Sequence, residues 1–265
     1  MKTLGIIGIG NMGEVIIRGV DNKSFARLYG YDAFSDKRAF IEEYGGIWLN
    51  SELEVVEKCK YILLAVKPQS VDELLRKIAP AVTADKVIIS ICAGITAEFI
   101  RSRTLPSTKV IRIMPNTPMM LGLGASAVST DELTSRDELQ FALSVFGGLG
   151  INEVIPPDKM NEIICINASS PAFIYLFAKG FTDYAVQQGI SEKAALNLFS
   201  QTLIGSGKML MDSGMSVDDL ISQVASKGGT TEAGLSQLHE KGLLEAVKSA
   251  CEACTARAWE LGREE

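Results

Sequence analysis

Residues 4–19 read LGIIGIGNMGEVIIRG, and this stretch decides the fold. Its first residues form a short apolar run typical of a buried strand, and the apolar positions after Gly13 continue as a helix. Between them, Gly8, Gly10 and Gly13 form a G-x-G-x-x-G turn. The first glycine permits the tight bend, the second lets a pyrophosphate approach the backbone, and the third lets the helix pack against the strand. We therefore predict a dinucleotide site at the helix start, where free N–H groups face the phosphates.

The composition is that of a folded, acidic protein. The chain has 265 residues and 47% hydrophobic content, enough for one or two domains with a substantial core. The formal charge of −6 argues against a nucleic-acid partner, because such binding relies on clustered Lys and Arg. The first residues enter the strand directly and leave no room for a signal peptide, so we expect a cytoplasmic protein.

The five cysteines indicate free thiols in a reducing compartment, because an odd number in a chain of this length does not suggest a disulfide framework. Cys251 and Cys254 form a C-x-x-C pair. On a helix they share one apolar face, and no second Cys or His pair completes a zinc site. We expect core packing there and no metal ion.

The second expected strand, residues 25–31, ends at Asp32. An acidic residue at this distance from the glycines accepts hydrogen bonds from the adenosine ribose 2′-hydroxyl and favours NADH. Ser35, Lys37 and Arg38 follow at a helix start and could instead receive the 2′-phosphate of NADPH. A third interpretation makes Asp32 a helix cap. The residues leave the choice of cofactor open.

Alternating strand and helix patterns follow, with strands at residues 61–66, 86–91 and 109–113 and helices at 51–58 and 71–78. This alternation predicts an α/β fold with a parallel, doubly wound sheet. Ligands of such sheets bind outside the carboxyl ends of the strands. We therefore expect the segments that follow these strands, residues 65–68, 91–94 and 114–118, to face one crevice.

Helical periodicity replaces the strand pattern from Asp158 onward. We predict a dinucleotide-binding domain at residues 1–157 and a helical domain at 158–265. The expected helix at residues 163–178 is uncharged and apolar nearly all round, yet it is too short and too interrupted by polar residues to span a membrane. Such a helix needs burial on every side, which predicts an obligate dimer.

A second chemical stretch, residues 224–235, reads VASKGGTTEAGL. Gly228 and Gly229 remove side chains ahead of a helix start. The N–H groups that follow, together with the hydroxyls of Thr230 and Thr231, could form a small site suited to a carboxylate. The alternative is an ordinary, well-capped helix start.

This stretch closely resembles the signature Ser-Pro-Gly-Gly-Thr-Thr of pyrroline-5-carboxylate reductases, the enzymes that make proline. Other motifs of that family stand in the expected order: IGIGNMG at residues 7–13, AVKP at 65–68, RIMPNTP at 112–118 and SSPA at 169–172. The resemblance covers essentially the whole chain.

The resemblance implies an N-terminal Rossmann domain and a C-terminal all-α domain that interlocks with a partner subunit. It implies a homodimer and leaves open an assembly of dimers into larger rings. For the cofactor it implies that the pyrophosphate binds at Ile7, Gly8, Ile9, Gly10, Asn11 and Met12, the adenosine half at Asn50, and the nicotinamide side at Ala65, Val66, Lys67, Pro68, Ile91, Cys92 and Ala93. For the substrate, a cyclic imine carboxylate, it implies Ser226, Gly228, Gly229, Thr230 and Thr231.

The implied reaction transfers a hydride from NADPH or NADH to the C=N bond of 1-pyrroline-5-carboxylate, which gives L-proline. A protonated cyclic imine is already a strong electrophile, so the protein must position it and exclude water. Thr231 is too weakly acidic to be a strong general acid. The resemblance places its hydroxyl at the ring nitrogen, where it could orient the imine and relay a proton from water.

Three departures from the family pattern leave alternatives open. Lys227 stands in place of the signature proline, Ala168 in place of a glycine, and Asp32 where many relatives carry a group suited to NADP. One alternative is a reductase of a six-membered or hydroxylated imine, and another is a nucleotide-binding regulator without turnover. A 3-hydroxy acid dehydrogenase is disfavoured, because residues 161–178 contain no lysine to serve as its catalytic residue.

Overall fold

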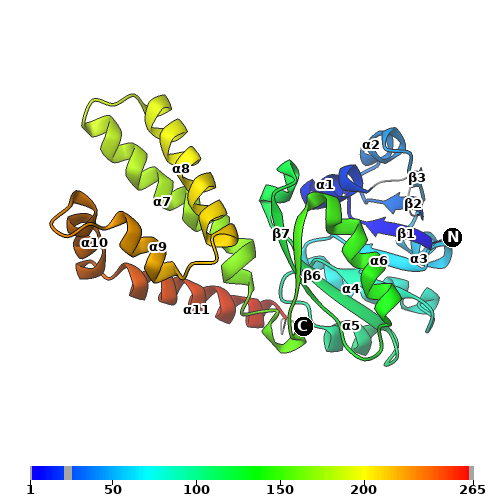
Figure 1. The fold of residues 1–265 in the computed structure, drawn as a ribbon. Helices are drawn as coiled ribbons and strands as arrows, with labels where there is room; N and C mark the ends of the chain where they lie inside the picture. Colours follow the sequence, from blue (N-terminus) through cyan, green and yellow to red (C-terminus); the bar gives the residue numbers. More distant parts are fainter. Residues whose placement is uncertain (1, 21–25, 263–265) are drawn as a thin grey trace. The chain divides into compact units, whose positions relative to one another are not determined.

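The computed structural model describes residues 2–20 and 26–262 and consists of two compact units (Figure 1). The first unit holds the described residues up to Ser169 and those from Ala253 onward, and the second spans Ser170–Glu252. We predicted a domain boundary after residue 157, twelve residues before the point where the compact units divide. The domain boundary itself remains a prediction. Residues 158–169 group with the sheet because Met160 and Ile164 pack against Met114 and Ala127.

The first unit is built on an eight-stranded sheet of order β3-β2-β1-β4-β5-β6-β7-β8. Neighbouring strands are parallel except β6 and β7, which are antiparallel. The strand order reverses between β1 and β4, and this reversal is where doubly wound sheets bind ligands. The strands are β1 (Lys2–Ile7), β2 (Ala26–Tyr31), β3 (Ile47–Trp48), β4 (Tyr61–Leu64), β5 (Val87–Ser90), β6 (Lys109–Met114), β7 (Gly124–Ser129) and β8 (Gly150–Val154).

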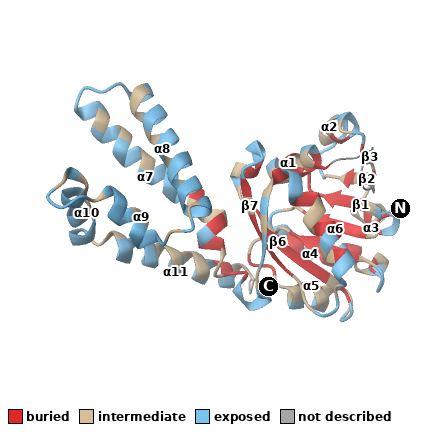
Figure 2. Cartoon of the chain, viewed as in Figure 1, coloured by how far each residue is buried: buried red, intermediate tan, exposed pale blue. Residues whose placement is uncertain are grey.

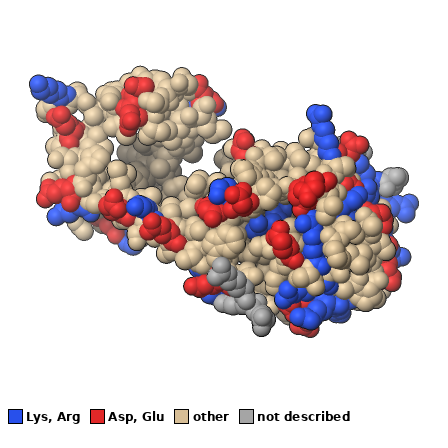
Figure 3. All heavy atoms as spheres, turned by 90° about the horizontal axis from the view of Figure 1, so that it is seen from below, with Lys and Arg blue, Asp and Glu red and all other residues tan. Residues whose placement is uncertain are grey.

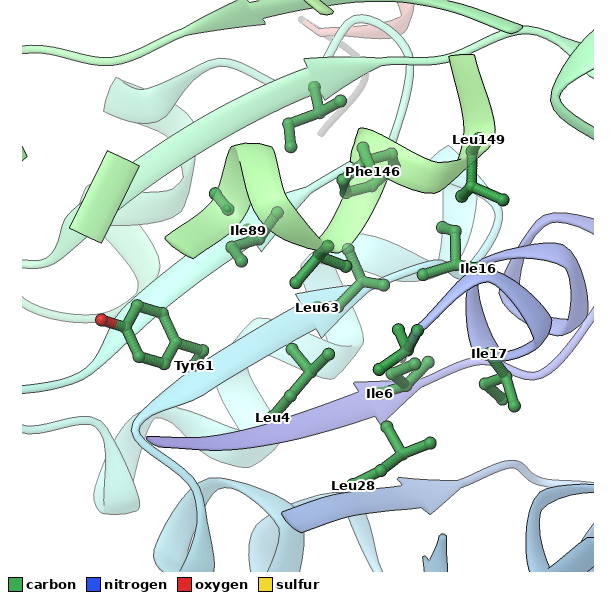
Figure 4. Packing of buried hydrophobic residues seen from close by; sticks show 14 of the residues in the cluster. Leu4, Ile6, Ile16, Ile17, Leu28, Tyr61, Leu63, Ile89, Phe146 and Leu149 are labelled. Carbon is green, nitrogen blue, oxygen red and sulfur yellow. The ribbon is translucent and has the colours of Figure 1, made fainter. Parts of the chain in front are cut away.

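Two apolar clusters, one on each face of the sheet, form the core of this unit, because successive strand residues point to opposite faces. Ile6 belongs to the cluster that includes residues of α1 and α6, and Ile7 to the cluster that includes residues of α3, α4 and α5. Figure 4 shows the first cluster, in which Leu4, Ile6 and Leu63 lie near Ile16. The helices are α1 (Asn11–Gly19), α2 (Lys37–Glu43), α3 (Glu52–Lys58), α4 (Val71–Ile78), α5 (Ala97–Arg103) and α6 (Arg136–Phe146).

The doubly wound sheet expected from the sequence is confirmed, with one correction. Strands β3, β7 and β8 were not predicted, and β7 makes the sheet mixed instead of wholly parallel. The helix expected at residues 163–178 begins instead as a π-helical turn, Cys165–Ser169, and continues as α7 (Ser170–Gln187). Part of the second expected strand, residue 25, lies outside the described residues.

The second unit is helical. Helices α7 and α8 (Glu192–Asp212) run side by side (Figure 1), joined by a stacked contact between Phe181 and Phe199 with ring centroids 4.4 Å apart. The remaining helices are α9 (Val217–Val224), α10 (Thr230–Glu240) and α11 (Leu243–Leu261), whose last turns belong to the first unit. The side chains of Ser191 and Ser216 cap α8 and α9 by accepting hydrogen bonds from Ala194 and Asp219 N–H groups.

Burial differs sharply between the two units. Figure 2 shows that buried residues concentrate in the sheet unit. Helices α7 and α8 carry large exposed apolar side chains. Leu176 and Leu198 are each 71% exposed in the single chain. Wide stretches of the helical unit's surface in Figure 3 carry no charged side chain. Among the described helices, none is long and apolar enough to cross a bilayer.

Candidate functional site

The turn between β1 and α1 has the geometry that the three glycines predict. Gly8 has a φ of +98°, and a Cβ there would lie 2.7 Å from the carbonyl of Ala65 at the end of β4. A Cβ on Gly13 would lie 2.3 Å from the carbonyl oxygen of Gly8. A Cβ on Gly10 would have no atom within 4 Å. No side chain caps α1, which follows Gly10. The loop therefore presents an open backbone and free N–H groups to an anion.

Asp32 is tied to this loop through one carboxylate oxygen and to the turn after β2 through the other. Oδ2 accepts from the Ile9 N–H at 2.6 Å, and Oδ1 accepts from the Phe34 N–H at 2.9 Å. The helix-cap interpretation of Asp32 is not supported, because α2 begins at Lys37 after Asp36 and no side chain caps it. A carboxylate has about four acceptor positions, so Asp32 retains capacity for a ribose hydroxyl.

A cavity of about 490 Å³ adjoins the loop and is lined by half of the predicted cofactor residues. Of the residues predicted from the sequence, the lining includes Ile7, Gly8, Ile9, Gly10, Asp32, Ala65, Val66 and Lys67. Sequence analysis missed other lining residues: Tyr31, Ala33, Phe34, Glu52, Ser70, Glu73, Leu74 and Lys77. Lys37, which was weighed as a partner of the 2′-phosphate, also lines it.

The cations near this cavity are mostly engaged by carboxylates. Lys37 Nζ donates to Glu14 at 2.9 Å, and this hydrogen bond raises the pKa of Lys37. Lys77 pairs with Glu52 at 2.7 Å, which likewise raises its pKa. Lys67 makes no ion pair with any residue that the structure describes. It follows β4, whereas Lys37 follows β2.

The remaining predicted cofactor residues do not line this cavity. Asn11 and Met12 form the first turn of α1, Ser35 lies exposed before α2, and the Asn50 N–H donates to Glu54 at 2.9 Å. Pro68 begins the short helix that precedes α4. Ile91, Cys92 and Ala93 follow β5.

Cys92 is buried, and its thiol donates to the Val66 carbonyl at 3.3 Å. Burial raises the pKa of the thiol to about 12. A thiol that stays protonated at neutral pH is a poor nucleophile, so the Cys92 side chain serves the packing between β4 and β5.

The motif at residues 112–118 holds the following segment onto the sheet. Buried Arg112 donates to Asn161 Oδ1 at 3.1 Å, and burial lowers the pKa of Arg112 to about 10. Asn116 donates to the Asn167 carbonyl at 3.0 Å and accepts from the Ala125 N–H at 2.9 Å. Asn167 Nδ2 in turn donates to the Met114 carbonyl at 2.6 Å. These bonds fix the π-helical turn beside the ends of β6 and β7.

Two of the three departures from the family pattern have plain structural settings. Ala168, in this turn, packs as a half-buried residue against the cluster that contains Met160 and Ile164, so its methyl group is accommodated. Lys227 is exposed and makes no ion pair with the described residues.

The loop at residues 226–230 is held by its own backbone and by Glu232. Gly228 has a φ of +74°, and its N–H donates to Glu232 Oε2 at 2.7 Å. The Gly229 N–H donates to the Ser226 carbonyl at 2.9 Å, and a Cβ on Gly229 would lie 2.6 Å from Ser226 Oγ. The N-cap residue of α10, Gly229, has no side chain to accept a hydrogen bond from the first N–H groups of this helix, which include those of Thr230 and Thr231. We predicted that Gly228 binds the substrate carboxylate. Its N–H instead donates to the carboxylate of Glu232.

Thr231 is half-buried and lines a large, mainly apolar hollow of about 1040 Å³ within the helical unit. The hollow is formed by α8, α9 and the start of α10, and its walls include Ile204, Met209 and Leu220. This hollow could not be predicted from the sequence, because its apolar residues lie on three helices and no local pattern specifies how these helices pack.

Comparisons with known proteins agree over the whole chain. Residues 157–261 match the family model described as pyrroline-5-carboxylate reductase dimerisation, and residues 3–94 match NADP oxidoreductase coenzyme F420-dependent. The chain is 34% identical to pyrroline-5-carboxylate reductase 3 of Xenopus laevis, over 98% of this chain and 96% of the relative. It is 30% identical to pyrroline-5-carboxylate reductase of Escherichia coli, over 99% of each.

Solved structures show the same likeness. The pyrroline carboxylate reductase of Plasmodium falciparum with NADP bound superposes with a TM-score of 0.88 at 27% identity, over 98% of both chains. The enzyme of Coxiella burnetii superposes with a TM-score of 0.89 at 27% identity, also over 98% of both chains. The full-length match, the glycine loop and the Gly-Gly-Thr-Thr helix start agree, and the chain belongs to the pyrroline-5-carboxylate reductase family.

Proposed function

We propose that the chain reduces 1-pyrroline-5-carboxylate to L-proline with NADH or NADPH. The observation that carries this proposal is the open glycine loop at the switch point of the sheet, in a chain that matches reductases of this name over its full length. A bound dinucleotide supplies a hydride to the imine carbon, and the ring nitrogen keeps the proton of the iminium form.

The residues of the first unit fit a dinucleotide. The N–H groups at the start of α1 take the pyrophosphate, and the bare Gly10 backbone lets it approach. Asp32 accepts a hydrogen bond from the ribose, with Ser35 and Asn50 on the adenosine side. The segments after β4 and β5, residues 65–68 and 91–93, shape the nicotinamide side.

The helix start in the second unit serves the substrate. The N–H groups of Thr230 and Thr231 hold the carboxylate, because no side chain caps them, and Glu232 keeps the loop in place through the Gly228 N–H. Ser226 supports the loop beneath Gly229. The Thr231 hydroxyl orients the imine nitrogen, which needs no strong acid because the iminium is already electrophilic.

For cofactor choice we propose that NADH serves at least as well as NADPH. The Asp32 carboxylate hydrogen-bonds a ribose hydroxyl and repels a 2′-phosphate. Among the relatives, the Plasmodium falciparum enzyme was solved with NADP bound.

The chain carries a dimerisation domain and forms a homo-oligomer. We propose an obligate homodimer that covers the exposed apolar faces of α7 and α8, and an assembly of such dimers as a further step. The cytoplasm is the proposed location, supported by five cysteines that are all free thiols.

The test is a spectrophotometric assay of NADH and NADPH oxidation with 1-pyrroline-5-carboxylate and with its six-membered homologue. Turnover of the five-membered imine, with proline as product, supports the proposal. Turnover of only the six-membered imine would show that the chain is a reductase of that related substrate. Dinucleotide binding without turnover of either imine would identify a regulator.

A further inference from the structure

Glu14 and Lys37 form an ion pair at the rim of the dinucleotide cavity. Glu14 lies in α1, four residues beyond Gly10, and Lys37 is the first residue of α2. Glu14 Oε1 and Lys37 Nζ are 2.9 Å apart, and the side chains are 25% and 31% exposed. Arg18 approaches the same carboxylate at 3.7 Å. Lys37 itself lines the cavity beside Asp32.

The other cations on the adenosine side are also paired. Arg38, next along α2, binds Glu42 at 2.8 Å, and Lys77 binds Glu52 at 2.7 Å. Lys67 is free of ion pairs among the described residues, but it follows β4, on the other side of β1 from β2. The 2′ position of the adenosine ribose is recognised at the end of β2. The cation placed to meet a 2′-phosphate there is therefore Lys37.

A 2′-phosphate can recruit Lys37 only at a cost. The lysine must leave or share the carboxylate of Glu14, and Glu14 adds a second negative charge to that of Asp32 near the phosphate. A ribose hydroxyl has no such conflict. We propose that Glu14 is a specificity-determining residue, which holds Lys37 away from a 2′-phosphate and so biases the site toward NADH. This inference rests on the proposed function.

Glu14 isolates this effect better than Asp32 does. Asp32 accepts a hydrogen bond from the Ile9 N–H of the glycine loop, so its removal releases the loop as well as the charge. Glu14 contacts Lys37 and Arg18 through its side chain and does not line the cavity.

The test measures dinucleotide affinity by calorimetry for the wild type, Glu14→Gln and Glu42→Gln. Glu42→Gln is the matched control, because it removes the same charge from a pair on α2 whose cation does not line the cavity. In Glu14→Gln, NADPH should bind about tenfold more tightly, the value of one charge-assisted hydrogen bond, while NADH affinity changes less than about twofold. The gain should shrink with added salt and disappear in Glu14→Gln/Lys37→Gln.

Three results would overturn the inference: an unchanged NADPH to NADH ratio in Glu14→Gln, an equal shift in Glu42→Gln, or a wild type that already prefers NADPH by about tenfold or more. Unchanged NADH affinity and melting temperature show that Glu14→Gln is folded. These results are distinct from failure of the proposed function. In that case the wild type would bind neither dinucleotide, or would bind them without reducing the imine.

Discussion

The backbone N–H of Ile9 donates a hydrogen bond of 2.6 Å to Oδ2 of Asp32, across 23 residues of sequence. The bond joins the glycine loop after β1 to the end of β2. The side chain proposed to recognise the ribose is therefore also the one that fixes the loop that binds the phosphates.

Asp32→Ala should consequently have two effects. Loss of the anchor should lower the free energy of unfolding by about 1–3 kcal/mol, measured by urea denaturation. Loss of the charge should shift preference toward NADPH, measured by calorimetry. Asp32→Asn retains an acceptor for the Ile9 N–H, so it should recover most of the stability and keep the shift. A wild type that strongly prefers NADPH would show that Ser35, Lys37 and Arg38 dominate instead.

Changing Gly10 to alanine should lower cofactor affinity, whereas changing Gly13 to alanine should lower stability. The methyl group of Gly10→Ala meets open space, so stability should hold while NADH affinity falls about tenfold or more, because the methyl occupies the path of the pyrophosphate. The methyl group of Gly13→Ala meets the Gly8 carbonyl oxygen at 2.3 Å and should cost about 1–3 kcal/mol of stability. Wild-type NADH affinity in Gly10→Ala would remove the loop from the cofactor site.

Thr231→Ala distinguishes orientation from proton relay. If the hydroxyl only orients the imine, kcat/KM should fall about ten- to a hundredfold, the value of one hydrogen bond of roughly 1–3 kcal/mol. If it relays a proton, the loss should be larger, fall on kcat, and be largely restored by Thr231→Ser. NADH affinity should stay unchanged in both cases. Wild-type kinetics would leave the Gly-Gly-Thr-Thr stretch as a helix cap.

The exposed apolar face of α7 should make the protein dimeric at micromolar concentration in sedimentation experiments. Leu176→Asp should weaken the dimer, because it places a charge on a face that requires cover. Leu121→Asp is the control, since Leu121 is 80% exposed but lies in the sheet unit. A natively folded monomer in the wild type would contradict the prediction.

Glu138 should make the fold sensitive to acid. Burial tends to raise its pKa, but hydrogen bonds from Lys109, from the Ser135 backbone and from Lys60 outweigh burial and lower the pKa from 4.5 to about 2. A lowered pKa stabilises the fold above the unfolded value, and that stability is lost as pH falls from about 5 toward 2. The shift corresponds to roughly 3 kcal/mol. Urea unfolding between pH 2 and 6 should show a smaller pH dependence in Glu138→Gln than in the wild type.

The sequence predicted elements whose signals are local. The glycine loop after β1, and the helices Glu52–Lys58 and Val71–Ile78, lie where the sequence pattern places them. Strand β7, with the sequence GASAVS, was missed because small residues carry little of the β-branched pattern that marks a strand. Strand β3 has only two residues and offers no pattern at all.

The long-range contacts of the candidate site could not be predicted, because no local sequence pattern specifies them. Glu52 and Lys77 reach the cavity from α3 and α4, and the pair of Glu14 and Lys37 joins residues 23 positions apart. The bond from Gly228 to Glu232 spans four residues, yet it depends on a side-chain rotamer that composition does not reveal. Family motifs indicated which segments form the site. Which side chains pair with one another became clear only from the structure.

The Glu14–Lys37 pair has a consequence for evolution. One base substitution converts a glutamate codon into a glutamine or lysine codon. A lineage carrying this chain is thus a single mutation from releasing Lys37, through a side chain that does not line the dinucleotide cavity. Selection acting on the relative supply of the two reduced dinucleotides in a cell could retune this enzyme without disturbing its fold.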